Sequence, residues 1–424
     1  IALVGFVLVW ILHPTVADGG VVRHEIAWMP TLGLNLVLTM DGLAWVFAGL
    51  VTGIGLLVVL YARYYMAAED PVPRFFAFLL AFMGSMTGMV LSGNLIQLVF
   101  FWEMTSLFSF LLIGYWHHTP AARDGARMAL TVTATGGLAL LAGVLVLGHI
   151  VGSYDLDLVL ASGDRIRAHP LYLPALILVL LGALTKSAQF PFHFWLPHAM
   201  AAPTPVSAYL HSATLVKAGV FLLARLWPVL AGTEAWFWIV GTAGLITLLL
   251  GAYVAIFQHD IKGLLAYSTI SHLGLITLLL GLNSELAMVA AIFHIINHAA
   301  FKASLFMAVG IIDHETGTRD IRKLSEVGRQ MPVLLVVAII AAASMAGVPP
   351  FGGFVAKEAV LEATMHEELL AGMPRNMMLV AYVLGSILTM AYSVYFCYGA
   401  FATKREQATN DAGQSEAVAT MHHV

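Results

Sequence analysis

About 12 runs of mainly apolar residues follow one another along the chain, and they constrain its fold more than any other feature. A helix needs about 20 such residues to cross a bilayer. Lipid offers no partner for a backbone N–H or C=O group, so each run is expected to be helical. The runs cover residues 1–13, 43–65, 75–93, 95–116, 127–152, 171–196, 204–227, 235–256, 262–281, 286–312, 331–366 and 375–400. They predict an all-α polytopic membrane protein.

Composition excludes most soluble classes. Of the 424 residues, 60% are hydrophobic and 10% are charged, whereas a soluble domain carries about 25% charged residues. The net charge of −4 argues against a nucleic-acid partner. The single cysteine, Cys397, lies in an apolar run, so a disulfide framework and a thiolate metal cluster are both excluded. The bilayer is the partner that this composition predicts.

Two of the runs are interrupted. The run 171–196 is broken at its end by Pro191 and Pro197, and a proline cannot continue the helical hydrogen-bond ladder. The run 331–366 is too long for one regular span, so it is expected to form two half-helices around an unwound link. The residues that break these helices are Pro191, Pro349, Pro350, Gly352 and Gly353.

The spacing of the breaks predicts a repeat. The two interrupted runs lie five apart, and each has a lysine, Lys186 or Lys357, beside its break. Two related five-helix units would produce this pattern. The expected divisions are N-terminal helices in 1–73, a first repeat in 74–230, a second repeat in 231–400 and a polar, disordered tail in 401–424. Since the chain begins at Ile1 inside an apolar run, we expect it to be a piece of a longer polypeptide.

Lysine and arginine divide unevenly between alternate loops, and the richer side is normally cytoplasmic. The richer side carries Arg74, Arg123, Arg127, Lys262, Arg319, Arg322, Lys323, Arg329, Lys404 and Arg405. The other side carries Arg23, Arg165, Arg167 and Arg375. The first side is therefore predicted to face the cytoplasm.

Charged residues inside the apolar runs need an explanation, because each costs about 2.5–3.5 kcal/mol at the bilayer centre. Glu103 lies in the middle of one run and is either half of a structural ion pair or a charge that sets the proton affinity of a lysine. The other intramembrane charges are mainly lysines, which can lose a proton usefully, whereas arginine cannot. The lysines are Lys186, Lys217, Lys302 and Lys357, with Lys262 at the entrance of the run that carries Ser268 and His272.

His294, His298 and Lys302 stand four residues apart and share one helical face. Each step rises about 6 Å, a gap that one water or hydroxyl can bridge. Histidine titrates near neutrality, so the three groups form a candidate proton wire. A lone membrane histidine is more often a packing residue, and His-x3-His also spaces two metal ligands, but no third ligand lies nearby. We therefore predict no metal. His211 and Lys217, six apart, are less well aligned.

Two further features have simpler interpretations. Asp41 precedes an apolar run and is expected to cap the helix N-terminus, where an acid is favoured. Phosphate loops, dinucleotide fingerprints, nucleophile elbows and iron–sulfur spacings are absent from the sequence, so no cofactor and no enzyme chemistry are predicted.

Five motifs resemble the antiporter-like subunits shared by respiratory complex I and the Mrp cation/proton antiporters. They are LTKSAQFPFHFWLPHAMAAPTPVSAYLHSATLVKAG, FFWEMTSLFSFLLIGYW, HDIKGLLAYSTISHLG, FHIINHAAFKASLF and AGVPPFGGFVAKE. The stretches around residues 28–66 and 313–324 look most like the large first subunit of the Mrp antiporters. The resemblance implies two inverted five-helix repeats with broken helices. It also implies an initial helix and a long C-terminal extension outside this chain.

By motif, Glu103 resembles the acid of the family's ion pair and Lys186 its lysine partner. His211, Lys217, Lys262, His294, His298 and Lys302 fall on the family's central polar axis, and Lys357 on its second broken helix. The function this implies is that of one component of a multisubunit Na+ or K+/H+ antiporter in the cell membrane, which works with other subunits. One alternative is a proton-pumping subunit of complex I or a membrane-bound hydrogenase. Another is a structural subunit that conducts nothing.

Overall fold

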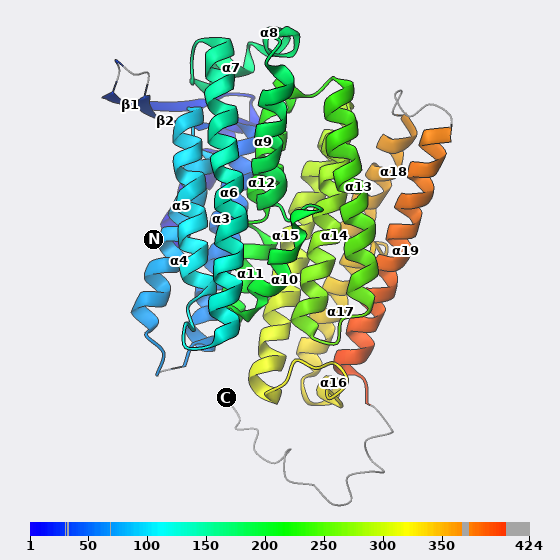
Figure 1. The fold of residues 1–424 in the computed structure, drawn as a ribbon. Coiled ribbons are helices and arrows are strands. Elements are labelled where there is room, and N and C mark those ends of the chain that lie inside the picture. Colours follow the sequence, from blue (N-terminus) through cyan, green and yellow to red (C-terminus); the bar gives the residue numbers. More distant parts are fainter. Residues whose placement is uncertain (30, 32–33, 68, 367–372, 404–424) are drawn as a thin grey trace, which may run out of the picture.

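The computed structural model describes residues 1–29, 31, 34–67, 69–366 and 373–403. Apart from one small hairpin, these residues form a bundle of helices (Figure 1). The N-terminal part holds α1 (Ala2–Ile11), α2 (His13–Ala17), β1 (Val22–Met29), β2 (Leu34–Met40), α3 (Gly42–Tyr65), α4 (Val72–Val90), α5 (Leu95–Ile113), α6 (Pro120–Val151), α7 (Leu156–Leu160), α8 (Gly163–Ala168) and α9 (Tyr172–Lys186).

The rest of the chain continues the bundle. It holds η2 (Phe192–Phe194), α10 (Trp195–His198), η3 (Ala199–Ala201), α11 (Thr204–Ser212), α12 (Lys217–Leu230), α13 (Glu234–Ile256), α14 (Ile261–Gly281), α15 (Glu285–Thr316), α16 (Val327–Gln330), α17 (Pro332–Ala346), α18 (Gly352–His366) and α19 (Met373–Phe401).

Every predicted apolar run contains one helix or a pair of half-helices. Among the described residues, 9 helices are long and apolar enough to cross a membrane. The shorter apolar helices α1, α9 and α17 account for the other three runs. The sequence therefore predicted the helical membrane architecture correctly.

Both predicted helix breaks are present. The helix α9 ends at Lys186, and only the short pieces η2, α10 and η3 follow before α11. The helix α17 ends at Ala346, and α18 begins at Gly352 beyond the two prolines. A Cβ atom on Gly353 would lie 1.7 Å from the carbonyl oxygen of Ser344, so the close approach of α18 to α17 requires glycine there.

A third break was not predicted. The run 204–227 was expected to be one continuous helix, but residues 213–216 separate α11 from α12. This link contains neither proline nor glycine, so the usual signals of a helix end are missing. A side chain satisfies one backbone carbonyl at this break. The Thr214 hydroxyl donates to the carbonyl oxygen of Tyr209 at 2.8 Å.

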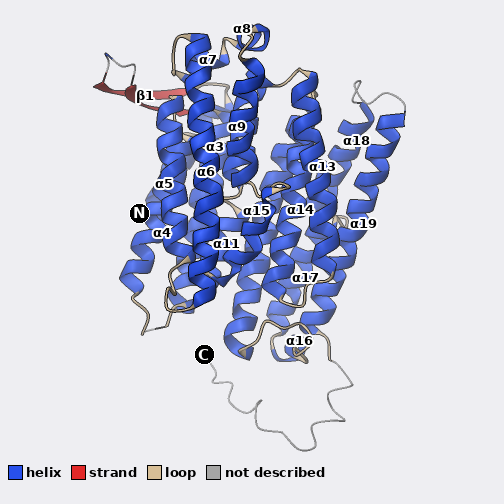
Figure 2. Cartoon of the chain, in the orientation of Figure 1, coloured by secondary structure: helices blue, strands red, loops and turns tan. Residues whose placement is uncertain are grey.

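The all-α prediction also overlooked a β-hairpin. Strands β1 and β2 pair antiparallel, with Val22 opposite Met40, and the pairing becomes irregular between Ile26 and Met29 (Figure 2). Arg23 anchors the hairpin through Asp155, at 2.6 Å, and Asp157. These partners lie more than 130 residues away in the chain, so local sequence gives no indication of them.

The loops that differ in basic residues lie at opposite ends of the bundle. The hairpin, α7 and α8 lie at one end, and α16 lies at the other (Figure 1). Arg165 and Arg167 belong to α8, whereas Arg329 belongs to α16, as the alternation of spans requires. Lys404 and Arg405, like nearly all of the predicted disordered tail, lie outside the described residues. Which end faces the cytoplasm remains a prediction.

Burial separates inner from outer helices. In their most apolar stretches, 89% of the residues are buried in the α11–α12 segment and in α14, but only 39% in α6 and α13. Together with α15, where the share is 67%, these inner helices carry six of the eight predicted histidines and lysines. Polar side chains on these helices are therefore shielded from lipid by the outer helices.

Asp41 caps α3 as predicted, because its Oδ1 atom accepts from the Ala44 N–H at 2.9 Å. It has a second role that the sequence did not indicate. The guanidinium of Arg225, on α12, binds both carboxylate oxygens of Asp41. The side chain of Arg225 is only 7% exposed, so this ion pair joins the first long helix to the centre of the bundle.

We predict that Asp41→Asn, which keeps a good N-cap but removes the charge, destabilises the protein by up to about 3 kcal/mol. Asp41→Ala also removes the cap and should cost about 1 kcal/mol more. Thermal unfolding of the purified protein in detergent measures both losses. The exposed Asp18, at the end of α2, provides the control Asp18→Asn. An Asp41→Asn midpoint equal to that of the control would show that the ion pair contributes nothing to stability.

Candidate functional site

The predicted site residues gather inside the bundle. Of the nine, seven are no more than 1% exposed: Lys186, His211, Lys217, Lys262, His294, His298 and Lys302. Glu103 and Lys357 are half-buried. The helices that carry them are α5, α9, α11, α12, α14, α15 and α18.

Lys186 lies at the broken end of α9 and reaches across to α5. Its ammonium donates to the carbonyl oxygen of Trp102 at 2.9 Å and to Ser106 Oγ at 2.6 Å. The same ammonium lies 5.0 Å from the centre of the Trp102 ring, a cation–π distance. Lys186 is thus held by groups on either side of Glu103 in the sequence.

Glu103 and Lys186 do not form the ion pair that the motif implied. Within the described residues, no carboxylate oxygen lies within 4.0 Å of the Lys186 ammonium. The Glu103 Oε1 atom is buried and accepts no hydrogen bond from the described residues. The acid and the lysine are neighbours that interact electrostatically.

Two glycines on α6, which sequence analysis did not single out, make room for this region. A Cβ atom on Gly137 would lie 1.6 Å from Glu103 Oε1. A Cβ atom on Gly136 would lie 1.8 Å from Thr185 Oγ1, beside Lys186. The bare backbone of α6 therefore accommodates side chains of both α5 and α9. Adjacent glycines in an apolar run look like helix-packing residues, and only the tertiary contacts reveal what they face.

The other buried lysines are held in the same way as Lys186, by neutral acceptors. Lys217 donates to the carbonyl oxygen of Ile295 at 2.9 Å, and Lys262 to that of Ala202 at 3.0 Å. Lys302 donates to Ser268 Oγ. Lys357 donates to the carbonyl oxygen of Ala346 at 2.7 Å, at the broken end of α17.

In the part of the chain that the structure describes, none of the five lysines is paired with a carboxylate. A lysine held by a carbonyl or hydroxyl group can gain or lose a proton without breaking an ion pair. Arginine could not replace these lysines in that role.

The file of His294, His298 and Lys302 lies on the buried face of α15, as predicted, but its members are not hydrogen-bonded to one another. Instead, His294 Nε2 lies 3.0 Å from Nδ1 of His272, on α14. Lys302 likewise turns to α14, where it meets Ser268. Neither ring nitrogen of His298 or of His211 bonds another described residue. The polar contacts run across from α15 to α14 rather than along α15.

Lys262 connects the interior to one end of the bundle. It lies in the first turn of α14, whose N-cap is Asp260. The Asp260 carboxylate also pairs with Arg319 at 3.2 Å, and both of these side chains are partly exposed. Lys262 therefore has charged surface groups on one side and the buried Ala202 carbonyl on the other.

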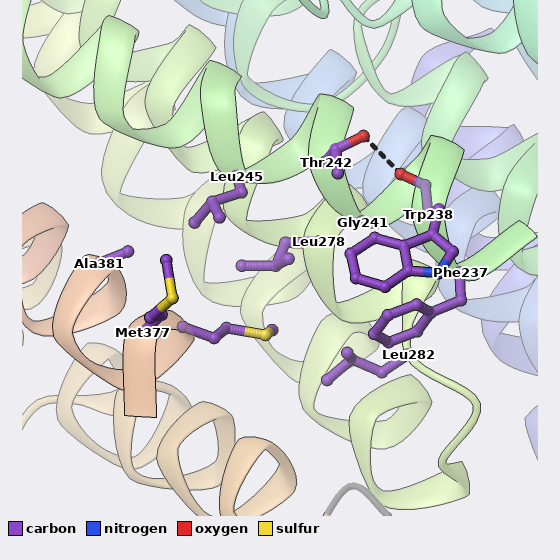
Figure 3. A pocket seen from close by; sticks show the side chains of 10 residues that line it. Phe237, Trp238, Gly241, Thr242, Leu245, Leu278, Leu282, Met377 and Ala381 are labelled. Atoms are coloured by element: carbon purple, nitrogen blue, oxygen red, sulfur yellow. Dashed lines mark hydrogen bonds between the residues drawn. The ribbon is translucent and has the colours of Figure 1, made fainter. Parts of the chain in front are cut away.

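One apolar pocket near the surface is separate from this chemistry. It measures about 410 Å³ and lies between α13, α14 and α19. Figure 3 shows Phe237, Trp238, Leu278 and Met377 around it. Thr242, which lines the pocket, donates its hydroxyl hydrogen bond to the carbonyl oxygen of Trp238 within the same helix. None of the ten residues that line the pocket is titratable, so it offers no site for ion chemistry.

The fold and these buried groups define a polytopic membrane protein with a central file of lysines and histidines. A family model described as the NADH:quinone oxidoreductase/Mrp antiporter transmembrane region matches residues 92–389. A second, described as the N-terminus of complex I chain 5, matches residues 28–76. The chain therefore belongs to the NADH:quinone oxidoreductase/Mrp antiporter family.

Individual relatives agree with this assignment. The chain is 67% identical to a probable K(+)/H(+) antiporter A/B subunit of Rhizobium meliloti over 95% of its length and 40% of that protein's. It is 49% identical to the Na(+)/H(+) antiporter A subunit of Alkalihalophilus pseudofirmus, over 95% of this chain and 52% of the relative. The chain thus spans about half, or less, of the length of these relatives.

Solved structures share the fold. The Mrp complex from Dietzia sp. aligns with a TM-score of 0.86 and 38% identity, over 93% of this chain and 43% of that one. An archaeal membrane-bound sulfane sulfur reductase aligns with a TM-score of 0.83 and 23% identity, over 96% of this chain and 84% of that one. The second match concerns the fold alone.

We predict that Gly137→Ala displaces the Glu103 carboxyl group and lowers the unfolding temperature of the protein, because the new methyl group overlaps Oε1. Alanine otherwise favours a helix interior over glycine by about 1 kcal/mol. Gly84→Ala on α4, where nothing lies within 4 Å of the added methyl group, is the matched control. A Gly137→Ala variant as stable as Gly84→Ala would contradict the close packing of Glu103 against α6.

Proposed function

We propose that this chain is part of one component of a multisubunit Na+ or K+/H+ antiporter of the cell membrane, and that it carries the proton. The observation that supports this best is the set of five lysines, four of them fully buried and Lys357 half-buried, each held by a neutral acceptor and interspersed with buried histidines. The similarity of the chain to K(+)/H(+) and Na(+)/H(+) antiporter subunits supports the same function. The expected partners are the other subunits of the complex, and no redox cofactor or enzyme chemistry is required.

Proton movement would begin where Lys186 and Glu103 lie side by side. In the present arrangement the Lys186 ammonium is bound to Trp102 and Ser106. Rotation toward Glu103 would exchange these bonds for an ion pair and change how tightly Lys186 holds its proton. Hydrogen bonds to charged groups contribute about 1.5–3 kcal/mol. One charge crossing 100 mV gains about 2.3 kcal/mol, so this exchange is large enough to gate the step.

From Lys186 the proton would pass to His211 and Lys217, and then to Lys262, His294, His298, Lys302 and Lys357. We assign the two halves of this file to the two five-helix units, 74–230 and 231–400. Each unit has a broken fourth segment, α9 to η3 in the first and α17 to α18 in the second, with a lysine at the break. The path of the metal cation lies outside this assignment.

We predict that Lys186→Ala reduces Na+- or K+-driven proton exchange by about tenfold or more, equivalent to about 1.4 kcal/mol of lost transition-state stabilisation. The assay is cation-induced recovery of an imposed pH gradient in everted vesicles that hold the whole complex. Lys323→Ala, which removes an exposed lysine of the loop between α15 and α16, should exchange normally. Unchanged exchange in a well-assembled Lys186→Ala complex would leave Lys186 a structural residue.

The same assay separates the alternative functions. Proton movement that does not depend on Na+ or K+ but requires the oxidation of NADH would assign the chain to a redox-driven pump. Normal exchange in variants of Lys186, Lys217 and Lys302 would assign it to a structural role. Either result would overturn the antiporter proposal.

A further inference from the structure

His272 occupies a position that the motif-based prediction of the site does not explain. It is 2% exposed and lies in the middle of α14. Its two ring nitrogens contact two different helices. Nδ1 lies 3.0 Å from His294 Nε2 on α15, and Nε2 lies 3.2 Å from the Tyr392 hydroxyl on α19. A histidine that forms hydrogen bonds through both Nδ1 and Nε2 connects its two partners in one hydrogen-bonded chain.

The chain continues beyond His272. Tyr392 is fully buried, and its hydroxyl also lies 3.4 Å from Thr389 Oγ1, one turn earlier on α19. The Thr389 hydroxyl donates its own hydrogen bond to the carbonyl oxygen of Gly385, at 2.8 Å. Thr389 can therefore accept from Tyr392 but cannot donate to it, and this sets the direction in which the Tyr392 proton can point.

Neutral histidine carries one proton on one of its two nitrogens, so the chain has only two complete arrangements. In the first, Tyr392 donates to His272 Nε2, His272 Nδ1 donates to His294 Nε2, and His294 holds its proton on Nδ1. In the second, every one of these bonds is reversed. His294 Nε2 donates to His272, His272 Nε2 donates to Tyr392, and Tyr392 donates to Thr389. The Nδ1 atom of His294 is then bare.

We propose that His294, His272 and Tyr392 form a branch of the proton path, which leaves α15 and crosses α14 to reach α19. The proposal rests on the proposed function and adds His272 and Tyr392 to the residues that carry it. Starting from the second arrangement, one proton binds His294 Nδ1. The Nε2 proton of His294 moves to His272 Nδ1, and the Nε2 proton of His272 moves to the Tyr392 oxygen. The former hydroxyl proton passes to a water molecule that must reach the buried Tyr392 oxygen beside Thr389, because Thr389 itself donates to the carbonyl oxygen of Gly385.

This transfer balances. One proton enters at His294 and one leaves at Tyr392, each of the three residues is neutral before and after, and the chain ends in the first arrangement. Return to the second arrangement requires tautomer exchange at both histidines, in which each ring loses its Nδ1 proton and binds one at Nε2, together with rotation of the Tyr392 hydroxyl. The His294 Nδ1 atom suits the entry point because it is buried and bonds no other described residue.

The geometry also distinguishes this branch from the predicted file along α15. No hydrogen bond among the described residues links His294 to His298, whereas the links from His294 through His272 to Tyr392 are direct. A hydrogen-bonded route is thus already present toward α19. His298 stays close to His272, with ring centres 5.5 Å apart, so it can supply the branch from the Lys302 side.

Three variants of the full complex test the branch by cation-driven proton exchange. His272→Gln preserves a donor and an acceptor but cannot pass a proton from one to the other. His272→Phe fills the space and removes both bonds. Tyr392→Phe removes only the hydroxyl. Since a lost proton-transfer group costs about 100-fold in rate, we expect all three variants to lose exchange to that extent while assembling normally.

Tyr395→Phe is the matched control. Tyr395 lies three residues further along α19, and its hydroxyl also meets a histidine, His259, at 3.4 Å, but at the surface. This variant removes a tyrosine–histidine bond of the same kind and should exchange like the wild type. Normal exchange in Tyr395→Phe would show that the losses in the other variants come from the buried branch, and not from weaker packing of α19 against the bundle.

The comparison of His272→Gln with His272→Phe decides between transfer and positioning. If Gln restores exchange and Phe does not, His272 merely holds His294 in place and the branch is wrong. Normal exchange in Tyr392→Phe would also overturn it. Lys186→Ala, measured in the same vesicles, tests the proposed function separately. Loss in Lys186→Ala with normal exchange in His272→Gln would retain that function and reject the branch. Normal exchange in both would reject both.

Discussion

The shortage of hydrogen-bond partners inside a bilayer governs this structure. A buried ammonium group carries three donors and no acceptor, and lipid satisfies none of them. The chain provides two of the acceptors by interrupting its own helices. Ala202, which accepts from Lys262, precedes α11 after the break in the sixth run, and Ala346, which accepts from Lys357, ends α17. The acceptors of Lys186, Lys217 and Lys302 lie inside the helices α5, α15 and α14.

Neutral acceptors have a consequence for function. An ion pair would fix each lysine in its charged form, whereas a carbonyl or hydroxyl oxygen holds it without doing so. Lys186 is bound by Trp102 and Ser106, and the proposed mechanism uses a second arrangement in which it pairs with Glu103 instead. A proton carrier needs such alternative arrangements, because each transfer must be reversible. The two arrangements of the His294–His272–Tyr392 chain have the same property.

Packing around these groups is correspondingly tight. Gly136 and Gly137 allow α6 to approach α5 and α9 so closely that no methyl group would fit. The Asp41–Arg225 pair fastens α3 to α12. Both features are contacts between segments far apart in the chain, and both hold helices that carry the polar groups. Rigid helices with mobile side chains would let protons move while the backbone stays in place.

Much of this protein follows from its sequence, because apolar runs of fixed length, prolines and intramembrane charges act locally. The runs located every long helix, Pro349 and Pro350 located the link between α17 and α18, and the lysines and histidines identified the buried polar groups. Partners across the bundle required the tertiary structure. Nothing local indicates that Lys186 bonds Ser106, that Lys302 turns to Ser268, that His272 joins His294 to Tyr392, or that residues 213–216 leave the helix. Helical periodicity determines which face a side chain occupies, but only the packing of distant segments determines which atom it meets.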